Sequence, residues 1–292
     1  MDKGVVIIAL KKAAYSCGAF NLALSIKHFN PNINITLLSD GEHRRHFGVT
    51  EYSVFNNIKE LPLCEYNDGS FQPGLAKLNF YQHSPYNRTL YIDADSLCLK
   101  DIGPLLDELS LSDKYIHSSV LGSGNKEDDI QYSVWATNKQ IWEYFDLKDD
   151  ARLNNINSSW IYVRKCKEAD EFFLKLNENY KKGFGVENLL HKWGGTYPDE
   201  LFYNGTLAQI QVNPYFEDKV MFFGNNLDPR STTQIQEDYY FLTLYGKGTG
   251  VTTVKQRYIE FYDRLMFSMC ENRGHEHKFK AHGMLTGKHV NR

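Results

Sequence analysis

Short apolar runs alternate with amphipathic segments from the start of the chain. Residues 5–10 (VVIIAL) are continuously apolar, which is typical of a strand buried on both faces of a sheet. Residues 16–29 carry Phe20 and Leu24 at helical spacing until Asn30-Pro31 ends the pattern, and a second apolar run follows at 33–38. This β-α-β opening has the length of a nucleotide-binding crossover, whose right-handed geometry brings both strand carboxyl ends to one edge.

The same alternation continues along the rest of the chain. A helix is expected to begin at Pro198, with Asp199 and Glu200 in its first turn, where the helix dipole favours acids. The other expected elements are strands at 89–92, 115–121, 132–136, 159–163, 210–212 and 239–245, helices at 75–83, 138–145, 168–180 and 253–270, and a polar loop at 122–129. No repeat, low-complexity block or clear linker interrupts this α/β pattern.

Segment 89–99 (TLYIDADSLCL) places two aspartates directly after an apolar strand. Asp93 and Asp95 repel each other, and the end of a buried strand desolvates both carboxylates. The next residues, 96–106, are again apolar and are closed by Gly103-Pro104, which argues against a solvated turn. Mg²⁺ and Mn²⁺ prefer carboxylate oxygen and often bridge one or two carboxylates to substrate phosphates. The motif therefore predicts a metal-dependent enzyme that handles a nucleoside diphosphate compound.

The C-terminal segment 282–288 (HGMLTGK) offers further groups for such a site. The imidazole of His282 would ligate the metal, and the ammonium of Lys288 would neutralise phosphate oxygens. Together they would cap a metal–diphosphate from the far side. In contrast, the glycines at 246–250 lack the strand–turn–helix context of a phosphate loop and indicate a flexible turn.

Composition narrows the class of protein. The 292 residues are enough for one large α/β domain. The net charge is 33 − 36 = −3, so no global basic field attracts nucleic acid or membranes. The five cysteines are scattered, and the apolar run after the N-terminal MDKG is too short for a signal peptide. We therefore expect a soluble, cytoplasmic protein with free thiols, located in the host cytoplasm if a phage encodes it.

Four blocks of sequence, in order, resemble GT-A-fold glycosyltransferases, and most of all glycosyltransferase family 8, the galactosyltransferase and glycogenin group. The first block is the 5–10 strand, the helix that contains Tyr15, and LLSD at 37–40. The second block, LAKL at 75–78 and LYIDAD at 90–95, closely matches the family's lysine helix and LYLDAD strand. The last two blocks, INSSWI at 156–161 and the 282–288 segment, resemble the family's FNSGV strand and its C-terminal His–Gly–Lys motif.

The resemblance implies a fold and its subdivision. We expect a single GT-A glycosyltransferase domain over 1–292, with a Rossmann-like mixed sheet flanked by helices and a C-terminal extension that closes over the donor site. Residues 1–110 would form the nucleotide-binding half and 111–252 the acceptor and sugar half. Residues 253–292 would contain the C-terminal helix and the His–Gly–Lys tail.

The resemblance also implies roles for single residues. Asp93, Asp95 and His282 would be the metal ligands, with Mn²⁺ favoured over Mg²⁺. Asp93 would also lie near the ribose and Asp95 near the diphosphate. The other positions implied for the donor are the nucleobase-pocket residues Ala9, Tyr15 and Asp40, the donor contact Lys77 and the diphosphate contact Lys288. The positions implied beside the transferred sugar and the acceptor are Asn157, Asp199 and Glu200.

The chain departs from the family's pattern in three places. Ser159 replaces the small residue of FNSGV and is followed by the bulky Trp160, and Glu200 stands where the family favours glutamine. Both changes bear on the identity of the donor sugar. The tail motif continues with His289-Val290 in place of Pro-Trp, which bears on how the tail closes.

The function implied is metal-dependent transfer of a sugar from a nucleoside-diphosphate sugar, with UDP-sugar favoured, to a hydroxyl acceptor with retention. The first hypothesis for the acceptor is a bacterial glycan or saccharide. The second is a hydroxymethylated base in phage DNA, which would need a local positive surface and aromatics around a flipped base. The stretch 221–252 matches nothing in the family and is expected to set acceptor specificity.

Two other classes stay open. A nucleotidyltransferase shares the β-α-β opening and paired acids, but residues 11–14 (KKAA) lack the glycines that follow its first strand. An inactive GT-A module that only binds a nucleotide sugar is the non-enzyme alternative. The set of Asp93, Asp95 and His282 argues against it.

Overall fold

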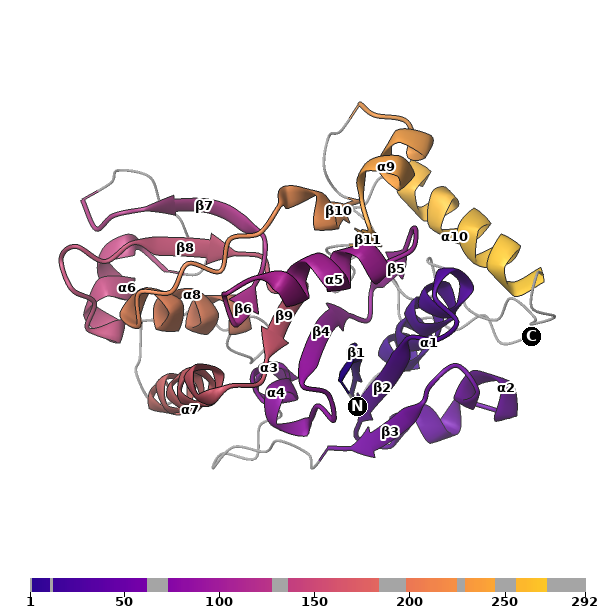
Figure 1. Ribbon diagram of the computed structural model, residues 1–292, viewed down its shortest axis with the longest axis horizontal. Helices are drawn as coiled ribbons and strands as arrows, with labels where there is room; N and C mark the ends of the chain where they lie inside the picture. Colours follow the sequence, from indigo (N-terminus) through magenta and orange to yellow (C-terminus); the bar gives the residue numbers. More distant parts are fainter. Residues whose placement is uncertain are drawn as a thin grey trace. The chain divides into compact units, whose positions relative to one another are not determined.

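The computed structural model describes residues 2–10, 13–61, 73–127, 136–183, 198–224, 229–244 and 256–271 (Figure 1). The chain divides into two compact units. Unit 1 contains Met1–Leu61, Leu90–Leu111 and Lys219–Arg292, and unit 2 contains Pro62–Thr89 and Ser112–Asp218. No helix in the described ranges is long and apolar enough to cross a membrane.

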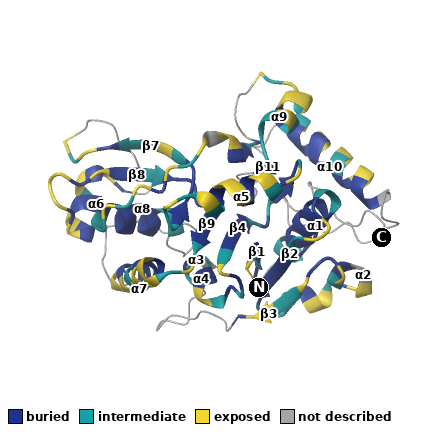
Figure 2. Ribbon diagram, in the orientation of Figure 1, coloured by how far each residue is buried: buried dark blue, intermediate teal, exposed yellow. Residues whose placement is uncertain are grey.

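A sheet whose first three strands are parallel forms the centre of unit 1. Its strands follow the order β3-β2-β1-β4, with bounds β1 Lys3–Ala9, β2 Asn34–Ser39, β3 Asn57–Glu60 and β4 Arg88–Asp93. β1 and β2 are parallel, and Ala9 pairs with Ser39, so their carboxyl ends lie level at one edge. Val5, Val6 and Ile7 are fully buried, as expected for a strand covered on both faces. Figure 2 shows the neighbouring β2 mostly in the colour of buried residues. The helix α1 (Ala13–Phe29) connects β1 to β2, which confirms the predicted β-α-β opening.

A second, mixed sheet completes unit 1. β11 (Phe241–Thr243) runs parallel to β10 (Met221–Phe223) and antiparallel to β5 (Ser96–Cys98). α10 (Gln256–Glu271) packs on α1, and the amide of Asn21 donates to the buried hydroxyl of Tyr262 at 3.2 Å. The remaining helices of this unit are η1 Glu42–Arg45, α2 Val49–Tyr52, α5 Gly103–Leu111 and α9 Thr232–Asp238; the short η2, Asp218–Val220, lies at the boundary between the units.

Unit 2 contains two antiparallel strand pairs and an aromatic core. β6 (Ile116–His117) pairs with β9 (Trp160–Arg164), and β7 (Val120–Gly124) pairs with β8 (Leu153–Ile156) across a bulge. The helices are α3 Pro73–Leu78, α4 Phe80–His83, α6 Asn138–Phe145, α7 Lys167–Lys182 and α8 Asp199–Gln209. The largest fully buried side chains of this unit include Phe145, Phe172, Phe202 and Tyr203. Both units therefore have the α/β architecture of sheets flanked by helices that the sequence predicts.

Three local predictions are wrong. Residues 210–212 form the turn that ends α8, because Gln211 takes a φ of 57° and Val212 N–H bonds back to Leu207 O at 2.9 Å. Gly103-Pro104 begins α5 and does not close the segment, since proline is tolerated in the first helical turn. The expected loop at 122–129 begins as strand, because β7 continues to Gly124. The strand predicted at 132–136 lies, apart from its last residue, outside the described residues.

Candidate functional site

The two predicted metal ligands lie where β4 ends. Asp93 is its last residue, Ala94 and Asp95 form a turn, and β5 begins at Ser96. Both aspartates are partly exposed, whereas Ala94 between them is buried. The backbone carbonyl of Asp95 accepts from Leu244 N–H at 3.0 Å, which attaches the turn to the strand end of β11. The apolar–acid–apolar pattern therefore produces a strand–turn–strand that presents both carboxylates at the surface.

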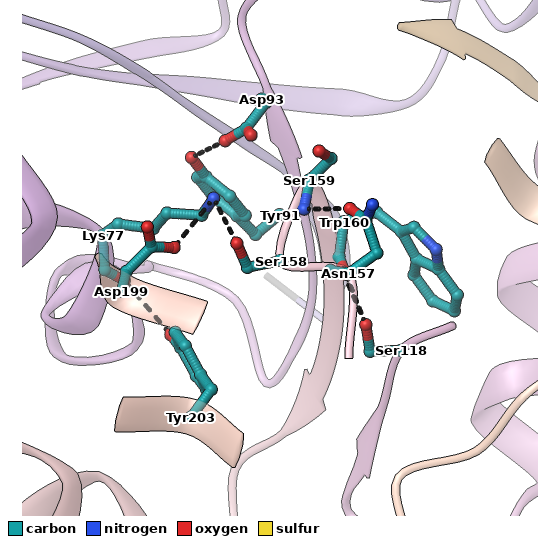
Figure 3. Close-up of polar contacts among 10 residues, drawn as sticks. All are labelled: Lys77, Tyr91, Asp93, Ser118, Asn157, Ser158, Ser159, Trp160, Asp199 and Tyr203. Carbon is teal, nitrogen blue, oxygen red and sulfur yellow. Dashed lines mark hydrogen bonds and ion pairs between the residues drawn. The ribbon is translucent and has the colours of Figure 1, made fainter. Parts of the chain in front are cut away.

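A neighbouring tyrosine orients one of these carboxylates. The buried Tyr91 lies two residues before Asp93 on the same face of β4, and its hydroxyl donates to Asp93 Oδ1 at 2.5 Å (Figure 3). A hydrogen bond to an ionised acceptor is short and strong, so it limits the rotation of the carboxylate. Tyr91 was not among the predicted site residues, although its i, i+2 spacing from Asp93 on a strand was visible in the sequence.

The first turn of α1 brings Tyr15 within electrostatic reach of both acids. Burial raises the pKa of the Tyr15 hydroxyl above its usual value, and the negative charges of Asp95 and then Asp93 raise it further. The pKa of the buried Tyr262 on α10 is also raised, mainly by burial, with smaller contributions that include Asp95. Negative charge is therefore concentrated at the end of β4.

The donor set fits a hard divalent cation. Two carboxylates on one turn are ligands that Mg²⁺ and Mn²⁺ take together with water and phosphate oxygen. Within the described part of the chain, no group of three or more His, Cys, Asp or Glu side chains could hold a metal. The predicted third ligand, His282, and the predicted diphosphate contact, Lys288, lie outside the described residues.

The segment after the acidic turn is fixed on α1 by buried polar side chains. Ser25 Oγ accepts from Cys98 N–H at 2.9 Å, and Asn30 Oδ1 accepts from Ile102 N–H at 3.1 Å. Both acceptors are buried, so these bonds satisfy backbone groups that water cannot reach. The helix that carries Tyr15 thus also positions the strand that follows Asp95.

The predicted nucleobase residues lie at the level ends of two strands: Ala9 is the last residue of β1, and Asp40 follows β2. Ala9 is fully buried, so its side chain is part of the core of unit 1. Asp40 Oδ1 accepts from Glu42 N–H at 3.2 Å and so shapes the turn into η1. The buried His43, which was not predicted, contacts Ser39 Oγ through Nδ1 at 2.8 Å. Burial and the nearby Arg44 lower the pKa of His43.

Within unit 2, Lys77 contacts one other predicted residue, Asp199, and also Ser158, which follows the predicted Asn157. Its ammonium lies 3.0 Å from Asp199 Oδ2 and donates to Ser158 Oγ at 3.0 Å (Figure 3). The side chains of Lys77 and Asp199 are only 13% and 22% exposed, so water screens this ion pair weakly. Tyr203, on the next turn of α8, donates to the backbone carbonyl of Lys77 at 3.3 Å. The structure therefore brings the predicted lysine of α3 to the first turn of α8.

Asn157 shapes the turn that leads into β9. Its side-chain oxygen accepts from Ser159 N–H at 2.8 Å, and its backbone carbonyl accepts from Ser118 Oγ at 2.8 Å (Figure 3). Asn157 and Ser159 are both buried. Glu200 follows Asp199 in the first turn of α8 and is partly exposed.

The large residue that departs from the family pattern belongs to the core. Trp160 is fully buried, and its indole N–H donates to Ser119 Oγ at 2.9 Å. Its ring packs edge to face on Phe216, with 6.1 Å between the ring centroids. The bulk of this side chain is therefore accommodated by the packing of unit 2.

Comparison with known proteins identifies the fold. No family model and no curated protein sequence matches the chain. Among solved structures, the bifunctional glycosyltransferase WbbM has a TM-score of 0.61 at 14% identity, over 99% of this chain and 52% of WbbM. The galactosyltransferase LgtC, solved with donor and acceptor sugar analogues, has a TM-score of 0.55 at 19% identity, over 94% of this chain and 99% of LgtC.

A third structure, the glycosyltransferase GlyE of Streptococcus pneumoniae, has a TM-score of 0.57 at 13% identity, over 94% of this chain and 64% of GlyE. The chain thus spans about half the length of WbbM and just under two thirds of GlyE, but nearly all of LgtC. Identities this low relate folds and do not transfer substrates. The chain has the mixed α/β fold of GT-A-like glycosyltransferases.

Proposed function

We propose that the protein is a metal-dependent glycosyltransferase that moves a sugar from a nucleoside-diphosphate sugar to a hydroxyl acceptor. UDP-sugar is the favoured donor, and the configuration at the anomeric carbon is retained. The observation that carries the proposal is the pair Asp93 and Asp95, presented at the end of β4 in a chain with this fold. The family-8 resemblance of segment 90–95 supports the same function.

The proposed cofactor is Mn²⁺ or Mg²⁺, held by Asp93 and Asp95. When bound, such a cation neutralises the charge of a diphosphate leaving group. Tyr91 holds the Asp93 carboxylate in one orientation, which lowers the entropic cost of binding. The sequence additionally predicts His282 as a ligand and Lys288 as a phosphate contact.

In unit 2 we propose sugar-contacting roles for Asn157, Asp199 and Glu200. Lys77 balances the charge of Asp199 and holds its carboxylate in place, so Asp199 is suited to accept hydrogen bonds from sugar hydroxyls. Glu200, in the same helical turn, supplies a second carboxylate. We assign no side chain as a nucleophile.

The proposed acceptor is a bacterial glycan or saccharide, in a cytoplasmic enzyme. Two observations support it: LgtC was solved with an acceptor sugar analogue, and the mouse xyloside xylosyltransferase 1 shares the fold at a TM-score of 0.51. The net charge of −3 favours this acceptor over modified DNA, which needs positive surface along the phosphates.

Donor turnover tests the proposal directly. Hydrolysis of a panel of UDP- and GDP-sugars is measured with Mn²⁺, with Mg²⁺ and with EDTA. We expect one donor to be hydrolysed only with the divalent cation, and Asp93→Asn or Asp95→Asn to reduce the rate at least about a hundredfold. Asp107→Asn, an exposed acid of unit 1 paired with Lys3, is the matched control and should keep the rate. Hydrolysis that persists unchanged in EDTA would rule the proposal out.

A further inference from the structure

We propose that a pocket in unit 2, lined by both polar and apolar groups, binds a neutral saccharide at a site that shares no residue with the donor-binding set. The pocket has a volume of about 370 Å³ and is formed by β7, β8 and the turn after α8. Its volume falls within the range of small-molecule sites, about 300–1,000 Å³. Its main polar lining residues are Asp150, Arg152, Asn154, Gln211, Asn213 and Tyr215.

The side chains in this pocket suit hydroxyl groups. Each hydroxyl of a sugar donates and accepts a hydrogen bond. In the pocket, the amides of Asn and Gln offer both partners, the Asp carboxylate accepts and the Arg guanidinium donates. The guanidinium of Arg152 is held in place by two hydrogen bonds to Ser123 Oγ, at 3.0 and 2.7 Å. Asp150 and Arg152 contribute one charge of each sign, so the pocket has no net charge with which to attract a phosphate or a carboxylate.

Tyr215 adds an aromatic surface at the pocket. It is 47% exposed, although the backbone on either side is fixed. Ser118 N–H donates to Pro214 O at 2.9 Å, and Phe216 N–H donates to Ser118 O at 3.1 Å. An exposed aromatic ring on a fixed backbone provides an apolar surface on which the C–H face of a pyranose can pack. The tyrosine hydroxyl can form hydrogen bonds with the hydroxyl groups at the edge of the sugar.

Gln211 occupies a position that would be more stable as glycine. It follows the last turn of α8 with a φ of 57°, in the left-handed region that disfavours a side chain, and Val212 N–H closes the cap on Leu207 O at 2.9 Å. Among the described non-glycine residues, only Asp146 shares a positive φ. A side chain that costs stability and also lines a pocket is typical of a functional site.

The first test separates binding from stability at Gln211. Labelled wild-type protein is applied to an array of neutral oligosaccharides, and the strongest ligand is then titrated by calorimetry. We expect saturable binding to the wild type and at least about a tenfold loss of affinity in Gln211→Gly. The Tm of Gln211→Gly should be unchanged or higher, because glycine relieves the left-handed strain. No saturable binding to any oligosaccharide overturns the proposal.

Two neighbouring acids provide the matched control. Asp150 lines the pocket, whereas Asp149 points to Lys126 at 3.1 Å and is fully exposed. Asp150→Asn should weaken binding of the array ligand and Asp149→Asn should not; equal effects of the two variants overturn the proposal. Donor hydrolysis should be unchanged in both variants, so a failure of this proposal is distinguishable from a failure of the proposed catalysis. Tripolyphosphate that displaces the saccharide would also contradict it.

Discussion

Two side chains keep the candidate carboxylates in fixed orientations. Tyr91 donates to Asp93 in unit 1, and Lys77 neutralises Asp199 in unit 2. The residue types of the acids could be predicted from their motifs. The spacing that brings Tyr91 beside Asp93 on a strand was also visible in the sequence, but the pairing of Lys77 with Asp199 depends on how the chain folds. The Lys77–Asp199 pair joins positions far apart in sequence, and no periodic pattern connects them.

Tyr91→Phe tests the first of these contacts. Removing the hydroxyl takes away a hydrogen bond to a charged acceptor, so the free energy of unfolding should fall by about 1–2 kcal/mol. Urea unfolding measures this change. The shift of Tm with added Mn²⁺ should also become smaller, since the Asp93 carboxylate is less well oriented. A variant with wild-type values of both quantities would show that the contact has no role.

Lys77→Met tests the ion pair of unit 2. The change leaves Asp199 as a partly buried, uncompensated charge, which should cost about 1–3 kcal/mol of stability. The double variant Lys77→Met, Asp199→Asn should recover much of this loss, because no charge then remains unpaired. A double-mutant cycle measured by urea unfolding checks the expectation, and strictly additive losses would argue against a coupled pair.

At the level of elements, α8 connects most of the features of unit 2. Its first turn carries Asp199 and Glu200, its middle packs on the aromatic core, and the pocket residue Gln211 follows its last turn. The buried Asn204 accepts from Ile156 N–H at 2.9 Å and so ties α8 to the end of β8. The geometry of this helix therefore influences both the candidate sugar contacts and the saccharide pocket.

Gly205→Ala shows how closely α8 packs. Alanine normally stabilises a helix over glycine by roughly 1 kcal/mol. At this position, however, an added Cβ would overlap the ring of Phe145, so we expect a net loss of about 1–3 kcal/mol. Thermal unfolding measures the change. The companion variant Gly205→Ala, Phe145→Leu should recover part of the loss, and a stabilised single variant would contradict the packing argument.

Element prediction succeeded where the apolar pattern was long. The helix expected at 138–145 is α6 with the same bounds, and α1 and α7 also form where the pattern predicts them. Short elements such as β3 and β10 were missed, because three or four residues give no periodicity. The helix α9 was also missed, although Ser231 and Gln234 form the capping box that marks its start.

At the scale of the whole molecule, unit 2 contains a histidine that should make folding sensitive to acid. His117 on β6 is buried against Tyr162 and Phe216, and burial lowers its pKa to about 4. Among the charges that affect it, Lys114 and Arg164 lower the pKa and Asp113 raises it. The native state therefore keeps this imidazole neutral at mildly acidic pH.

The unfolded chain takes up a proton on this imidazole near pH 6.5, whereas the native state does so only near 4. The free energy of unfolding should consequently fall as the pH drops through this window, by roughly 2 kcal/mol at pH 5 from this residue alone. Unfolding curves at pH 7 and pH 5 measure the effect. In His117→Phe, the free energy of unfolding should differ less between pH 7 and pH 5 than in the wild type. If the variant lost as much stability as the wild type, the acid sensitivity would belong to other groups.

Unit 1 is built from three separate stretches of chain, whereas unit 2 is complete at Asp218. The contact between Asn21 on α1 and Tyr262 on α10 joins residues 241 positions apart. During synthesis, α1, β1 and β2 therefore leave the ribosome before the last stretch of unit 1 exists. Until that stretch is synthesised, the apolar surface that it covers stays exposed. We expect nascent chains halted just after residue 218 has left the ribosome to resist proteolysis in unit 2, while α1 still binds chaperones. The proposed nucleotide-binding unit would then fold last.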